Sequence, residues 1–110
     1  MIEETIKHIE SRLQETGALT EGDRAELLKL MELLRAEVSE LSKTSQEHAR
    51  SIAGFAQVSA HEVTRKDRNQ KLVDVSLEGL SSSVQGLENS HPRLVQIVNR
   101  IAVMLSNTGI

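Results

Sequence analysis

Apolar and small residues recur along the middle of the chain at spacings that alternate between four and three residues. The series runs through Leu27, Met31, Leu34, Val38, Leu41, Ser45, His48, Ile52 and Phe55. This alternation is typical of a helix that packs one seam of side chains against a partner helix. His48 is the one clearly polar member, and a polar seam residue lowers stability while it fixes the register of pairing.

Further apolar stripes predict three more helices in a single domain over residues 1–110. We expect helices over residues 1–16, 21–64, 70–89 and 91–108. Thr20 followed by Asp23 resembles a capping pair at the start of the second helix. Pro92 favours the start of the fourth helix, because the fixed backbone angle of proline suits a first helical turn.

Two local signals concern turns and ends. Residues 61–71 contain only one apolar residue, Val63, which favours a bend near residues 66–69 over a continuous helix. Gly109 followed by Ile110 predicts a Schellman cap with a positive φ at Gly109, because glycine is the residue that most readily adopts this left-handed conformation.

The predicted second helix is long for a small protein. An unbroken helix over residues 21–64 would extend for about 65 Å at 1.5 Å per residue, more than one chain of this size can cover. The sequence therefore predicts an all-α protein: a long antiparallel helical hairpin, in a coiled-coil-like bundle of three to four helices that is completed by oligomerisation. We expect the alternating series from Leu27 to Phe55 to form the interface of a homo-dimer or homo-tetramer. An unidentified protein is the alternative partner.

Composition removes several classes of function. Phe55 is the single aromatic residue, which argues against a ring-lined pocket and against base stacking on single-stranded nucleic acid. The net charge of −3 also argues against nucleic acid as a partner, since general nucleic-acid binders are basic. No membrane span is expected, because the longest apolar run covers only residues 101–105. Without a signal-peptide pattern at the N-terminus, we expect a cytoplasmic protein.

Three groups of residues are candidates for binding or catalytic chemistry. His48 is a weak candidate for a metal or ligand carrier at a symmetric interface, but we favour a hydrogen-bonded histidine that sets register. Arg65, Lys66, Arg68 and Lys71 are candidate contacts for an anionic partner, nucleic acid or a membrane surface, but we favour a solvated bend. His61 and Glu62 resemble part of a metalloprotease motif whose second histidine is missing. No motif indicates catalysis or a bound cofactor.

The C-terminal residues carry a resemblance to a known family. Leu87-Glu88-Asn89-Ser90-His91-Pro92-Arg93-Leu94, with Gly109-Ile110 at the end, resembles a bacterial family of short helical proteins classed as a domain of unknown function. The resemblance implies a helical fold and supplies no activity. Our leading hypothesis is therefore a non-enzymatic, homo-oligomeric helical scaffold or protein-interaction module. The alternatives are binding of an anionic partner through residues 65–71 and a metal or ligand carrier that uses His48.

Overall fold

The structure, a computed structural model, describes residues 2–108 and is all-helical over that range. Its five helices are α1 (Ile2–Glu15), α2 (Glu21–Ser42), α3 (Gln46–Thr64), α4 (Gln70–Ser82) and α5 (Pro92–Asn107). The predicted all-α class is therefore confirmed. The predicted cap at Gly109 lies outside the described residues.

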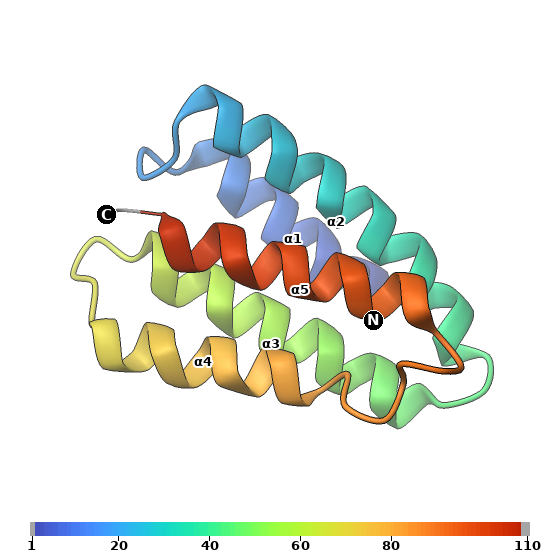
Figure 1. The fold of residues 1–110 in the computed structure, drawn as a ribbon. Helices are drawn as coiled ribbons and strands as arrows, with labels where there is room; N and C mark the ends of the chain where they lie inside the picture. The colour runs from blue at the N-terminus through green and yellow to red at the C-terminus, as the bar shows by residue number, and fades with distance from the viewer. Residues whose placement is uncertain (1, 109–110) are drawn as a thin grey trace.

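The helices form a bundle that measures 37 × 24 × 22 Å along its principal axes. Figure 1 shows α1 and α2 as one antiparallel pair and α3 and α4 as a second pair. Helix α1 packs against both α2 and α3, and α5 packs against α2, α4 and α3. The last helix therefore closes the bundle by joining the two pairs.

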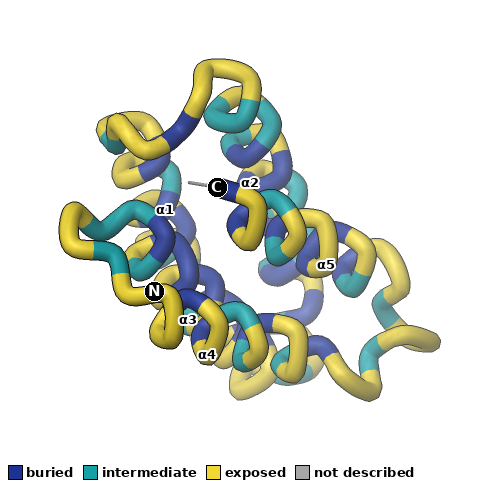
Figure 2. Tube along the Cα trace, turned by 60° about the vertical axis from the view of Figure 1, so that its left-hand side comes forward, coloured by how far each residue is buried: buried dark blue, intermediate teal, exposed yellow. Residues whose placement is uncertain are grey.

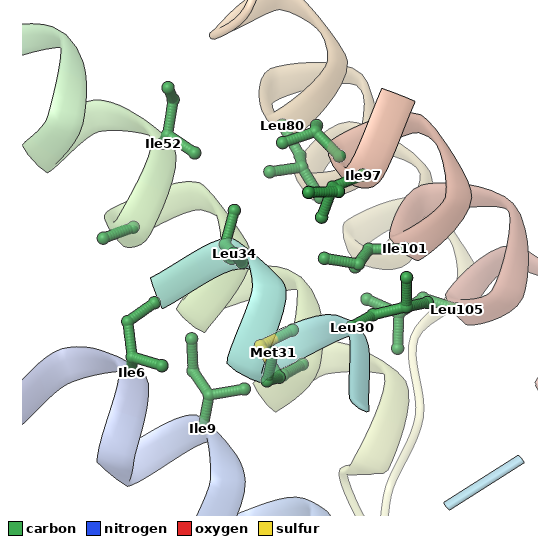
Figure 3. Packing of buried hydrophobic residues seen from close by; sticks show 14 of the residues in the cluster. Ile6, Ile9, Leu30, Met31, Leu34, Ile52, Leu80, Ile97, Ile101 and Leu105 are labelled. Carbon is green, nitrogen blue, oxygen red and sulfur yellow. The ribbon is translucent and has the colours of Figure 1, made fainter. Parts of the chain in front are cut away.

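Aliphatic side chains from every helix fill the interior. Figure 2 shows that the buried residues of each helix face the centre, while exposed residues lie on the outside. Figure 3 shows side chains that meet in this core; those it labels are Ile6, Ile9, Leu30, Met31, Leu34, Ile52, Leu80, Ile97, Ile101 and Leu105. Each is at most 6% exposed. Burial of such a side chain contributes about 1.5–3 kcal/mol, so this cluster is the main source of stability.

The expected single helix over residues 21–64 is instead two helices, α2 and α3, joined by a tight turn. Ser45 leaves the helical conformation with φ −149° and ψ 94°, and its Oγ accepts a hydrogen bond from the His48 amide. The Thr44 hydroxyl donates to the Leu41 carbonyl at 3.2 Å. Hydroxyl side chains that bond to nearby backbone groups compete with helix continuation. The chain thus folds back at Ser45, and no 65 Å rod exists.

Because of this turn, the predicted seam packs against helices of the same chain. The aliphatic members of the series from Leu27 to Ile52 are each at most 2% exposed, because α1, α3 and α5 cover them within the same chain. They are therefore not available to a second copy, and their assignment to an oligomer interface is wrong. Ser45 is half-buried as a helix cap, and only His48 and Phe55 of the series are exposed.

The other boundaries differ less from expectation. The chain bends at residues 65–69, where the sequence favoured a bend. Helix α4 ends at Ser82 and does not continue to residue 89. The Ser83 hydroxyl donates to the Leu80 carbonyl at 2.6 Å, and Gly86 then adopts φ 88°. That left-handed conformation suits glycine, so Gly86 turns the chain towards Pro92, the first residue of α5.

Candidate interaction surface and the predicted site residues

Most of the large apolar side chains left exposed lie on the α3–α4 pair. Among the described residues, the exposed large apolar side chains are Phe55 and Val58 on α3, Leu72 and Val75 on α4, and Val103 on α5. Their exposed fractions range from 41% for Phe55 and Leu72 to 59% for Val103. Four of the five therefore belong to one helical pair.

The packing of Phe55 fixes how these four residues are arranged. Its ring lies against Gly79, where an added Cβ would stand 2.4 Å from Cε1 of the ring. Val58 lies one turn after Phe55, and Val75 lies one turn before Gly79. Because α3 and α4 are antiparallel (Figure 1), Val58 and Val75 stand at the same level of the pair. We call Phe55, Val58, Leu72 and Val75 the apolar strip.

Two charged residues stand on either side of Val75 on α4. Lys71 precedes Val75 by four residues and Glu78 follows it by three, so all three lie along one face of the helix. All three are exposed. Neither Lys71 nor Glu78 has an ion-pair or hydrogen-bond partner within residues 2–108. The α4 part of the apolar strip therefore carries one free charge of each sign.

The four predicted anion contacts do gather on the α3–α4 bend, but two of them have partners within the chain. Arg65 pairs with Glu62 at 2.9 Å, and this hydrogen bond and charge raise the pKa of Arg65 above its usual value. Arg68 donates to the Thr108 carbonyl at the end of α5. Lys66 and Lys71 are exposed. The two arginines thus hold the bend to its neighbours, and half of the basic cluster is used for structure.

His48 lies in the first turn of α3 and is exposed, not packed in a seam. Its Nδ1 atom lies 2.7 Å from the Oγ atom of Ser45. The described residues contain no group of three or more histidine, cysteine, aspartate or glutamate side chains that is placed to hold a metal ion. His48 is thus hydrogen-bonded to Ser45, but it is exposed at the start of α3 and does not set register in a seam as we expected.

Sequence reasoning missed a polar groove between α1 and α3. It has a volume of about 480 Å³, and its lining includes His8 and Arg12 from α1 and Gln57, His61 and Thr64 from α3. The four-residue spacings of His8 with Arg12 and of Gln57 with His61 are visible in the sequence. The groove was not predictable from them, because the pairing of α1 with α3 depends on the turn at Ser45.

The structure is a small all-helical bundle. A comparison of the sequence with known families then shows which family the chain belongs to. Residues 34–110 match the family described as Domain of unknown function (DUF4404). This range covers more than two thirds of the chain, so the protein belongs to that family. It includes α3, α4, α5 and the second part of α2, and hence the whole apolar strip. No curated protein and no solved structure matches the chain.

No helix in the described part of the chain combines the length and the apolar character that crossing a membrane requires. The longest helix, α2, has a charged or polar residue in every turn.

Proposed function

We propose that the protein is a non-enzymatic helical scaffold that self-associates through the apolar strip. The observation that carries this proposal is the collection of four of the five exposed large apolar side chains on one helical pair. Together they expose on the order of 300 Å², the lower end of the range for the largest apolar patch on a typical monomer, which is often functional. The apolar strip is thus the dominant feature of the exposed surface of the α3–α4 pair.

Geometry favours a second copy of the chain as the occupant. A two-fold axis that passes between the copies at the level of Val58 and Val75 places α3 on α3 and α4 on α4, each pair antiparallel. Val75 then meets Val75 of the other copy. Because Lys71 and Glu78 lie one turn on either side of Val75, Lys71 of each copy lies beside Glu78 of the other. An isologous interface requires this kind of self-complementarity.

The size of the strip sets the expected strength. Two copies bury on the order of 600 Å² from these side chains, and a polar rim adds to it, whereas stable interfaces bury about 1,200–2,000 Å² in total. We therefore expect a weak dimer that forms as the protein concentration rises. A weak contact of this kind suits a scaffold that assembles locally and dissociates on dilution.

The test is the native mass of the protein over a range of concentrations, by light scattering after size exclusion. We expect the mass to rise from one 12.2 kDa chain towards two. Val75→Glu places a charge in the middle of the strip and should hold the protein at one chain mass. Ala36→Glu is the matched control, because Ala36 is an exposed apolar residue that lies on α2, outside the α3–α4 pair. Equal behaviour of the two variants would refute the proposed interface.

A further inference from the structure

We infer that the groove between α1 and α3 binds a small oxyanion, which Arg12 holds through its guanidinium group. The inference is independent of self-association, because no residue of α4 and none of the apolar strip lines the groove. It rests on three observations: the lining of the groove, the way Arg12 is held, and the partners of the other arginines.

The lining of the groove is rich in hydrogen-bond donors. Arg12, His8, His61 and Gln57 each offer at least one N–H group, whatever the protonation state of the histidines. Glu15 is the one acid among the residues that line it. Such a surface is complementary to a ligand that only accepts hydrogen bonds, and phosphate and carboxylate groups are ligands of this kind. The volume of about 480 Å³ leaves room for a small anion and its water.

Arg12 is held in place without using its outer nitrogen atoms. Its Nε–H group donates to Oγ1 of Thr64 at 2.6 Å. The Thr64 hydroxyl in turn donates to the carbonyl of Ala60 at 2.6 Å. This chain of two hydrogen bonds fixes the guanidinium at the groove. The two terminal nitrogen atoms have no partner within residues 2–108, so their donors are available to an anion in the groove that Arg12 lines.

The other arginines show that this arrangement is unusual in the chain. Arg24, Arg35, Arg65, Arg68 and Arg100 all give terminal nitrogen atoms to carboxylates or carbonyls of the same chain. Arg50 on α3 and Arg93 on α5 are exposed without such partners in the described residues, and neither lines the groove. Arg12 combines a fixed side chain, free donors and a groove. A guanidinium of this kind binds phosphate and carboxylate groups in a two-pronged contact.

The experiment is a titration of the ¹⁵N-labelled protein followed by amide chemical shifts at constant ionic strength. Inorganic phosphate and citrate are the two probes, and their comparison separates a phosphate ligand from a carboxylate ligand. We expect changes in amide chemical shift that saturate with ligand. They should be confined to residues 8–16, in the second half of α1 and just after it, and to residues 57–64 of α3. Saturation by either probe supports the inference, and the tighter one identifies the chemistry.

Three variants are expected to change anion binding in different ways. Arg12→Gln should weaken binding about tenfold or more, because charge-assisted hydrogen bonds are lost. Glu15→Gln should tighten binding several-fold, because it removes the negative charge at the groove, and partial unfolding cannot produce a gain. Arg50→Gln is the matched control and should bind like the wild type. No saturable shift with either probe, or equal losses for Arg12→Gln and Arg50→Gln, would overturn the inference.

Discussion

Replacing Arg24 by methionine is the sharpest test of how the first two helices are joined. The Arg24 side chain is 16% exposed and reaches back from α2 to the end of α1. Its terminal nitrogen atoms donate to the carbonyls of Leu13, Gln14 at 3.0 Å and Thr16 at 2.9 Å. These include carbonyls that the last turn of a helix leaves without partners, and a cation there also suits the helix dipole.

The size of the effect follows from these contacts. A hydrogen bond to a charged group contributes about 1.5–3 kcal/mol net, and two of the bonds, those to Leu13 and Thr16, are partly buried. In the variant, methionine keeps most of the apolar stem of the arginine, and some of the freed carbonyls form hydrogen bonds with water instead. We therefore expect Arg24→Met to lower the free energy of unfolding by about 3 kcal/mol. For a chain of this length, the melting temperature should fall by roughly 10–15 °C.

The assay is urea unfolding followed by circular dichroism at low micromolar concentration, where the protein is expected to be monomeric. Arg100→Met is the control, since Arg100 is 66% exposed and lies 3.4 Å from Glu26. An exposed pair of this kind contributes at most about 1 kcal/mol. If the two variants differ by less than about 0.5 kcal/mol, the account of Arg24 as the cap of α1 is refuted.

Two further predictions concern the α2–α3 turn and the apolar strip. Ser45→Ala removes the cap of α3 and should lower the free energy of unfolding by about 1 kcal/mol. Ser51→Ala, at an exposed position within the same helix, should not lower it. Urea unfolding of both variants measures the difference. Gly79→Ala should displace the Phe55 ring, which NMR would detect as shifted ring-proton resonances. The free energy of unfolding should change by less than about 1 kcal/mol, because the gain in helix propensity offsets the lost ring contact. A loss of more than about 3 kcal/mol would contradict that reading.

The sequence predicted the helical class and which faces of the helices point inwards. Leu27, Met31, Leu34 and Ile52 are all buried, as the alternating series required. The series did not reveal the turn at Ser45, because a turn that keeps the same faces inward leaves the periodicity unchanged. It therefore placed a partner chain where α1, α3 and α5 of the same chain lie. Hydroxyl residues at positions 42, 44 and 45 were the local signal for the turn.

The candidate surface was predictable only in part. Val58, Leu72 and Val75 are apolar residues outside the predicted seams, and apolar residues left outside a seam are candidates for surface contacts. Phe55 was assigned to the seam, yet its ring lies at the edge of α3 against Gly79. That the four form one strip depends on the antiparallel course of α3 and α4. The groove at Arg12 depends on the contact of α1 with α3, which no local pattern encodes.

Sedimentation equilibrium of two charge reversals at the proposed dimer contact tests the central claim most directly. Lys71→Glu and Glu78→Lys each place like charges together twice in a symmetric dimer, and the double variant restores opposite charges in exchanged positions. Exposed pairs contribute about 0.2–1 kcal/mol each, so each single variant should weaken dimerisation by roughly tenfold. The account predicts that the double variant recovers the wild-type dissociation constant. Single reversals that leave the constant unchanged, or a double variant as weak as the single ones, would contradict it.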